Sequence, residues 1–260
     1  MYFDTHVHLN SERYDNVKEI IDRAVENGVK KMVVVGYDLE TSVKAVEIAS
    51  NFNFIYAAIG IHPSEVKKAK ISDFEALEKL LSNSKVVAIG EIGLDYHWDK
   101  DNKEYQKRFF VEQLKLASKY NLPIIIHSRD AAEDTYEILK ENKKYYKKGI
   151  MHCYSYSLEM ANKFIDLNFK IAFGGALTFL NAKENKNVVY NLDVKNLLIE
   201  TDAPYLTPHP YRGKINEPKY IGLVVDEIAK IKRMDKEEVA RITYNNACDL
   251  FGVEKWKLKN

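Results

Sequence analysis

Eight short apolar segments rich in β-branched residues recur along the chain, and amphipathic stretches separate most of them. The apolar segments are residues 2–7, 31–35, 55–59, 86–91, 123–127, 149–152, 169–173 and 196–201. Short, nearly continuous apolar runs are typical of strands that are buried on both faces of a parallel sheet. The sequence therefore predicts eight parallel strands.

Apolar residues recur at helical spacing between these segments. Helices are predicted for residues 17–27, 41–51, 74–82, 103–120, 131–142 and 158–168, with a final pair within residues 221–250. Strands that alternate with helices in a chain of 260 residues favour an α/β fold of the (β/α)8 TIM-barrel type, regular or distorted, over an open doubly wound sheet. The glycines at positions 90, 93, 174 and 175 lack the spacing of a dinucleotide-binding or P-loop motif.

Composition agrees with a single domain that spans residues 1–260. Hydrophobic residues make up 46% of the chain, enough for a substantial core, and no linker-like stretch or internal repeat divides it. With 39 basic and 38 acidic residues, the formal net charge is only +1. The chain thus lacks the general positive charge of proteins that coat long nucleic acids, and any phosphate recognition is expected to be local.

Cysteine content and hydropathy favour a cytoplasmic protein. Cys153 and Cys248 are the only cysteines, and they are far apart without C-x-x-C spacing, so neither a disulfide framework nor a cysteine zinc site is indicated. The first predicted strand starts at the amino terminus, and no uninterrupted apolar run approaches the roughly 20 residues of a membrane span. We expect neither secretion nor membrane insertion.

Metal-binding side chains fall at the carboxyl-terminal ends of the predicted strands. These ends carry His6 and His8 (first strand), Glu91 (fourth), His127 (fifth), His152 (sixth) and Asp202 (eighth). In a (β/α)8 barrel the strand ends form one mouth, so the six side chains are expected to converge. Asp4 is expected on the same face as the two histidines that follow it, because side chains two residues apart leave a strand on the same side.

Imidazole and carboxylate ligands without a thiolate suit zinc, and also manganese or a similar divalent ion. Six ligands exceed the needs of one tetrahedral centre, so we expect two ions roughly 3.5–4 Å apart, with no organic cofactor. Glu91 is the expected bridge, because its strand lies between the two groups of histidines. Each residue alone has a structural interpretation as well: a core histidine often only forms hydrogen bonds, and Asp202 also suits a turn.

Further side chains near the predicted mouth have two interpretations each. His62, next to Pro63, is assigned to substrate contact or to support of the metal ligands, with loop ordering as the alternative. Asp4 is expected either to orient the second nitrogen of a ligand or to form a plain buried hydrogen bond. Arg129 and Arg212 are expected to hold phosphate oxygens through paired guanidinium donors, with solvated surface charge as the alternative.

Aromatic residues in the same loops are expected to contact a substrate. Tyr96, Trp98 and Tyr205 offer faces for stacking on a terminal base, a contact that tolerates any base. Packing beneath the loops is the alternative interpretation for Tyr205.

Several motifs in series resemble a known family. They are DTHVH at residues 4–8, GEIGLDY at 90–96, PIIIHSR at 123–129 and ETDAPYL at 200–206, followed by RGK at 212–214 and NEP at 216–218. With these motifs the chain resembles the TatD family of metal-dependent deoxyribonucleases, within the amidohydrolase superfamily. The resemblance runs essentially from end to end.

The resemblance implies a distorted barrel with two divalent ions. One ion would be held by His6, His8, Glu91 and Asp202, and the other by Glu91, His127 and His152. The implied activity is hydrolysis of DNA phosphodiesters, often as an exonuclease, with magnesium, manganese or zinc. One departure is visible: Ile215 stands where the family often has arginine, which removes one cation near the expected phosphate-binding rim.

The functional hypothesis is hydrolysis of DNA by a metal-activated water. Asp202 is expected to act as both ligand and general base, and Glu91 takes part in catalysis as the bridging ligand. A nearly neutral chain favours a short single-stranded end entering the mouth over tight binding to extended duplex. The alternative is an amidase, esterase or deacylase acting on a small molecule, because the same activated water attacks a carbonyl carbon.

Overall fold

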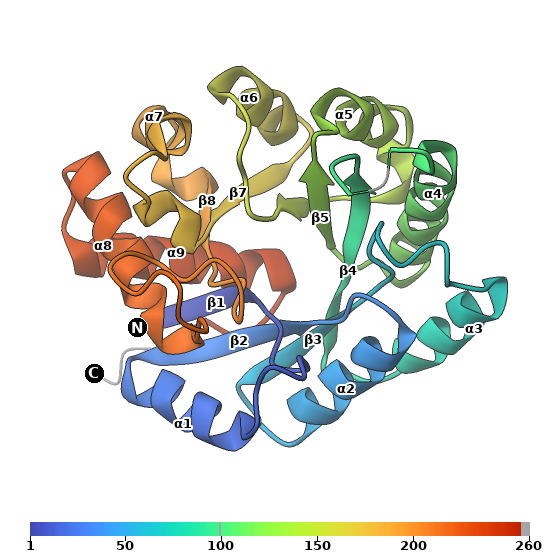
Figure 1. Cartoon of the computed structure of the whole chain (residues 1–260). Helices are drawn as coiled ribbons and strands as arrows, with labels where there is room; N and C mark the ends of the chain where they lie inside the picture. Colours follow the sequence, from blue (N-terminus) through green and yellow to red (C-terminus); the bar gives the residue numbers. More distant parts are fainter. Residues whose placement is uncertain (99, 256–260) are drawn as a thin grey trace.

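Eight parallel strands form one sheet that curls into a nearly closed barrel, with helices around its outside (Figure 1). A computed structural model describes residues 1–98 and 100–255, so position 99 and positions 256–260 of the expected single domain lie outside the described residues. The strands are β1 (Tyr2–Val7), β2 (Val29–Val35), β3 (Ile55–Ile59), β4 (Val86–Asp95), β5 (Ile124–Arg129), β6 (Gly149–Met151), β7 (Phe169–Phe173) and β8 (Leu197–Ile199), hydrogen-bonded in this order. The predicted (β/α)8 barrel is confirmed.

Helices connect the strands and extend the chain beyond β8. They are α1 (Val17–Glu26), α2 (Leu39–Ser50), α3 (Ile71–Leu80), α4 (Lys103–Tyr120), α5 (Ala132–Glu141), α6 (Leu158–Asp166), α7 (Lys183–Asn191), α8 (Ile221–Lys232) and α9 (Lys236–Phe251). Helix α7 lies outside the predicted helices, because its sequence is largely polar and buries only Val188 and Val189. Among the residues that the structure describes, no helix combines the length and apolarity needed to cross a bilayer.

The strands contribute to two apolar cores on their opposite faces. The outward faces pack against the surrounding helices, as Val34 and Ile126 do. The inward faces fill the barrel with residues from every strand, including Phe3, Val33, Ala58, Ala88, Ile125, Ile150, Ala172 and Leu198. Tyr244 and Phe251 of α9 pack on Phe3, with ring centroids 5.9 and 5.7 Å from its ring, so α9 covers the amino-terminal end of the barrel.

The barrel closes between β1 and β8 through residues that follow β8. The backbone N–H of Asp202 donates to the carbonyl oxygen of His6 (3.0 Å), and the N–H of His8 donates to that of Ala203 (2.8 Å). Asp202 has φ 55°, in the left-handed region that aspartate tolerates better than most residues. The closure therefore brings side chains from the two edge strands of the sheet, β1 and β8, to the same mouth.

Strands β4 and β5 both continue past their predicted ends. Strand β4 reaches Asp95 instead of residue 91, so Glu91 and His127 lie within their strands and not at the ends. Gly93 pairs with His127 in this extension and has φ 137°. A Cβ at Gly93 would lie 2.0 Å from the carbonyl oxygen of His127, so this close approach of the two strands requires glycine.

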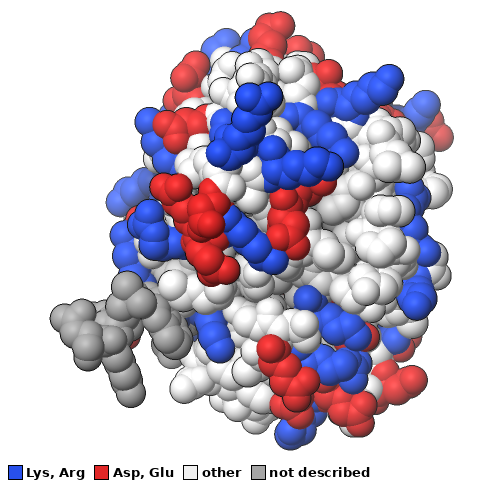
Figure 2. Space-filling view, turned by 90° about the vertical axis from the view of Figure 1, so that its left-hand side faces the viewer, with Lys and Arg blue, Asp and Glu red and all other residues white. Residues whose placement is uncertain are grey.

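The surface carries both signs of charge in close mixture. Figure 2 shows lysine and arginine side chains interspersed with acidic ones on the side of the molecule that it presents. This mixture agrees with the formal net charge of +1.

Candidate metal centre

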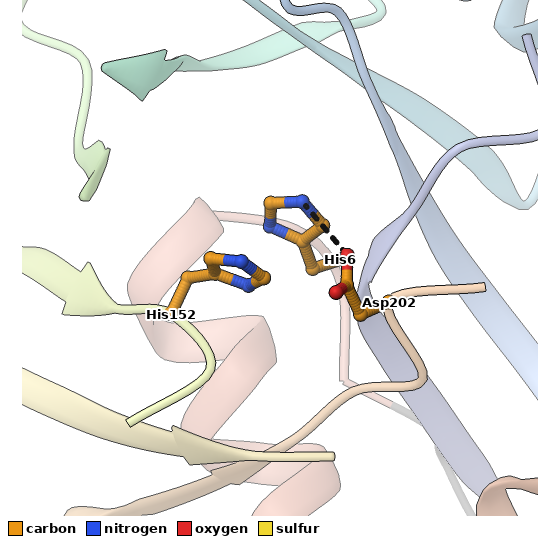
Figure 3. Close-up of side chains that lie close together, drawn as sticks. All are labelled: His6, His152 and Asp202. Carbon is orange, nitrogen blue, oxygen red and sulfur yellow. Dashed lines mark ion pairs between the residues drawn. The ribbon is translucent and has the colours of Figure 1, made fainter. Parts of the chain in front are cut away.

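The six predicted ligands converge at the mouth of the barrel. Nε2 of His6 lies 3.1 Å from Nε2 of His8 and 3.9 Å from Oδ1 of Asp202. The ring of His152 stacks on that of His6, with centroids 3.7 Å apart. Figure 3 shows His6, His152 and Asp202 pointing toward one another from β1, the segment after β6 and the segment after β8.

Glu91 lies between two groups of histidines and presents one carboxylate oxygen to each. Its Oε2 is 3.4 Å from Nε2 of His6 and 3.8 Å from Nε2 of His8. Its Oε1 is 2.8 Å from Nδ1 of His127 and 3.4 Å from Nε2 of His152. A carboxylate oriented in this way is suited to bridge two ions.

The second ring nitrogens of two histidines have hydrogen-bond partners outside the cluster. Nδ1 of His8 donates to the carbonyl oxygen of Val35 (3.0 Å), which leaves Nε2 as the nitrogen with a free lone pair. Nε2 of His127 lies 3.0 Å from Oδ2 of Asp95. Burial alone would raise the pKa of Asp95, but its hydrogen bonds, above all that with His127, lower it to about 2.

Glu200 stands behind His152. Its Oε1 lies 3.0 Å from Nδ1 of His152 and accepts a hydrogen bond from the backbone N–H of Cys153 (2.7 Å). Glu200 is completely buried. Acidic residues behind metal-binding histidines orient the ring and raise its basicity.

Glu91 and His6 have protonation states that suit metal binding, whereas nearby carboxylates outweigh burial and raise the pKa of His8, His127 and His152, the last to about 10. Burial alone would raise the pKa of Glu91, but the histidines around it, His152 first, hold it well below its usual range. Burial lowers the pKa of His6, and the nearby His152 lowers it further. An ionised carboxylate and a neutral imidazole are the forms that bind a metal ion.

The donor atoms fit divalent ions. In each of two groups, His6–His8–Glu91 and Glu91–His127–His152, the ligand atoms lie within 4.8 Å of one another. The buried Nδ1 atom of His6 has no hydrogen-bond partner in the described part of the chain. An unpaired buried nitrogen atom is costly, so its presence in a cluster of candidate ligands supports a functional site. The mixed nitrogen and oxygen set suits zinc or manganese better than calcium.

A cleft of about 390 Å³ opens above the cluster. Besides five of the six ligand candidates, it is lined by Tyr37, His62, Ser64, Glu65, Asp95, Trp98, Arg129 and Tyr205. His62 accepts a hydrogen bond at Nδ1 from the N–H of Ser64 (3.1 Å), and its Nε2 lies 3.7 Å from Oε1 of Glu91. His62 thus both orders its loop and faces the cleft.

Two predicted contacts have other partners in the structure. Tyr96 is buried and its hydroxyl donates to Asp134 (2.6 Å), so it is not a stacking surface in the cleft. Arg212 places its guanidinium 3.9 Å from the centroid of the Phe179 ring and does not line the described cleft. Neither Tyr96 nor Arg212 therefore lines the described cleft, and their contact with a substrate stays a prediction.

Asp4 has the plain buried role that was its second interpretation. Its carboxylate accepts hydrogen bonds from the hydroxyl (2.5 Å) and N–H (3.0 Å) of Thr201 and from the N–H of His6. Burial raises its pKa to about 7. Asp4 therefore holds β1 against the segment after β8 and does not orient an imidazole ring.

Asp95 and Glu200 are the residues that the sequence interpretation omits. Both lie at even spacing from a recognised ligand candidate, Asp95 four residues after Glu91 and Glu200 two before Asp202. Strand periodicity was the signal that could have found Asp95, because residues four apart on a strand leave on the same face.

Comparisons with known proteins identify the family of this chain. The family described as TatD related DNase matches residues 3–252. The uncharacterized metal-dependent hydrolase YabD of Bacillus subtilis is 50% identical over 254 residues, which cover 97% of this chain and 100% of the relative. A crystal structure of YjjV, a TatD homolog from Escherichia coli K12, matches with a TM-score of 0.93 and 34% identity over 97% of this chain and 98% of that one. The chain belongs to the TatD family of metal-dependent hydrolases.

Proposed function

We propose that this protein is a deoxyribonuclease that uses divalent metal ions to shorten DNA from strand ends. The observation that carries the proposal is the position of Glu91, whose two oxygens face separate groups of histidines below an open cleft. His6, His8, Glu91 and Asp202 would hold one ion, and Glu91, His127 and His152 the other. Bound zinc, magnesium or manganese would polarise the phosphodiester and lower the pKa of the attacking water.

Asp202 is the proposed general base. Its Oδ1 faces Nε2 of His8 at 3.4 Å, which leaves the second oxygen to accept a proton from the attacking water. Burial alone would raise the pKa of Asp202, but the hydrogen bond with His8 and the charge of nearby histidines lower it. The carboxylate is therefore ionised and able to take up a proton at neutral pH.

His62 and Arg129 are the proposed contacts to the nonbridging phosphate oxygens. Since Nδ1 of His62 accepts a hydrogen bond from Ser64, its proton is on Nε2, the nitrogen that faces the cleft. Arg129 is exposed at the rim and offers paired donors with the spacing of phosphate oxygens.

Charge favours a short substrate over a long one. A formal net charge of +1 and mixed surface charge offer little attraction to an extended duplex, so a single-stranded end is the favoured substrate. The chemistry needs no organic cofactor. We assign the reaction to the cytoplasm, where thiols such as the free Cys153 and Cys248 stay reduced.

The test is hydrolysis of a short end-labelled single-stranded DNA. Metal-free protein is reconstituted separately with zinc, magnesium and manganese, and a panel of carboxylic esters and amides is assayed in parallel. Metal-dependent, stepwise shortening from one end supports the proposal and gives the polarity of cleavage. Intact DNA together with turnover of an ester or amide overturns it in favour of an acyl hydrolase.

A further inference from the structure

Two exposed aromatic rings in the cleft are each paired with an arginine. The guanidinium carbon of Arg129 lies 5.5 Å from the ring centroid of Trp98, and that of Arg13 lies 4.9 Å from the ring centroid of Tyr205. Both rings line the cleft above the metal centre. Trp98 is 72% exposed and Tyr205 is 40% exposed.

Each ring is attached to a different end of the metal centre. The backbone N–H of Trp98 donates to Oδ1 of Asp95 (3.1 Å), the carboxylate whose other oxygen contacts His127. The N–H of Tyr205 donates to the carbonyl oxygen of Asp202 (2.8 Å). The Tyr205 ring also meets the edge of His8, with centroids 5.9 Å apart. One ring thus adjoins each group of ligands on either side of Glu91.

The positive charges of Arg13 and Arg129 are available to a substrate. In the part of the chain that the structure describes, neither Arg13 nor Arg129 lies within ion-pair distance of a carboxylate. A guanidinium stacked on an aromatic face keeps its edge donors free for phosphate oxygens. An aromatic ring next to such a donor is the combination that binds a nucleotide through both base and phosphate.

We propose that Trp98–Arg129 and Tyr205–Arg13 form two nucleobase subsites, one on each side of the scissile phosphate. This inference rests on the proposed nuclease function and names its substrate: a strand with unpaired bases on both sides of the cleaved bond. Bases in a duplex are stacked on each other and do not present a free face, so a paired end must fray before it binds.

The experiment compares two single-stranded tetranucleotides in the metal-reconstituted enzyme. One carries four bases, and the other has abasic tetrahydrofuran residues on both sides of the cleaved bond. Kinetics are measured for the wild type, Trp98→Ala, Tyr205→Ala and the double variant, with Trp98→Phe as the conservative replacement. Tyr190→Ala is the matched control, because Tyr190 is 61% exposed on α7 and does not line the described cleft.

We expect the wild type to have a KM for the base-bearing strand about tenfold lower per stacked base than for the abasic strand. The double variant loses this preference, Trp98→Phe retains part of it, and Tyr190→Ala keeps all of it. A double variant that retains the full preference overturns the subsites. Absence of DNA cleavage by the wild type overturns the nuclease proposal itself, and is distinguished because it appears without any substitution.

Discussion

The backbone N–H of Asp202 donates to the carbonyl oxygen of His6 across 3.0 Å, so one of the bonds that close the barrel joins two residues of the metal centre. The bond uses backbone atoms only, which leaves both side chains free to face the ligand cluster. Closure of the fold and assembly of the site are therefore one structural event.

Asp202→Asn separates the part that the backbone of residue 202 has in barrel closure from the proposed role of its carboxylate as general base. The backbone bond to His6 persists, so the free energy of unfolding should remain close to that of the wild type. Loss of the proposed base should lower kcat by about 10²-fold or more. Steady-state kinetics on the end-labelled DNA and urea unfolding measure both quantities. Turnover near the wild-type rate would contradict the role of Asp202 as base.

Gly93→Ala should disrupt the position of His127. The new methyl would meet the carbonyl oxygen of His127 at 2.0 Å, at a φ that non-glycine residues rarely adopt. We expect the free energy of unfolding to fall by about 3 kcal/mol. Gly213→Ala is the control, because its φ is also positive but nothing lies within 4 Å, and it should cost only about 1 kcal/mol. Equal losses in the two variants would rule out the proposed steric cause.

Glu200→Gln should weaken metal binding without removing a ligand. The ion pair with His152 is lost, while the amide oxygen can still accept the N–H of Cys153. Loss of a partner behind a ligand typically weakens metal binding about 10–100-fold. Calorimetric titration of the metal-free protein measures this, with Glu137→Gln on α5 as an exposed control. Unchanged affinity for both ions would show that Glu200 only fills space.

Arg129→Ala and Arg212→Ala should differ in their effect on DNA hydrolysis. Arg129 lines the cleft, whereas Arg212 stacks on Phe179. Removal of Arg129 should raise the KM for DNA about tenfold, since a hydrogen bond to a charged group contributes about 1.5–3 kcal/mol. Arg212→Ala should change it less than twofold. The opposite ranking would move phosphate binding to the loop after β8.

The ionisation of Glu217 should make the free energy of unfolding depend on pH in the acid range. Burial alone would raise its pKa, but hydrogen bonds from Arg23 (2.8 Å) and Lys219 together lower it below the ordinary value of 4.5. A carboxylate with a lowered pKa stabilises the fold fully above that value, and this contribution is lost as the pH falls below it. We expect Glu217→Gln to unfold more easily than the wild type by about 0.5–1 kcal/mol at pH 7.

Urea unfolding at pH 7 and pH 3 tests this dependence. The wild type and Glu217→Gln should converge at the lower pH. The control is Glu137→Gln, which removes an ion pair with Lys140 in which both side chains are exposed. Its free energy of unfolding should match that of the wild type at both pH values. A constant difference between wild type and Glu217→Gln would assign the effect to packing instead of charge.

The alternation of apolar segments and the position of ionisable residues were enough to predict the barrel and the convergence of its ligands. His6 and His8 are two apart on a strand, and strand ends meet at one mouth whatever the loops do. Tyr96 shows that a motif alone does not tell which side a residue faces. It directly follows Asp95, so its side chain leaves on the opposite face and is buried against Asp134.

Loop conformation is the part that the sequence did not determine. Arg212 lies in a segment without strand or helix, where neither strand alternation nor helical spacing predicts which way its side chain points. Asp4 lies two residues before His6 and was therefore expected on the same face of the strand. The β1–β2 register shifts between Asp4 and Val7, however, and Thr201 donates hydrogen bonds to both carboxylate oxygens of Asp4. Contacts between residues nearly 200 positions apart decide such cases.

Helix α9 packs under Phe3 and the inward side chains fill the barrel, so the cleft above the metal centre opens at the carboxyl-terminal mouth among the described residues. A strand end and the nucleotide released from it must then pass through the same opening in opposite directions. The shortened strand has to withdraw before the nucleotide can depart, so each cycle favours dissociation over continued threading. Digestion is expected to be distributive, with free nucleotide competing with the strand for the cleft.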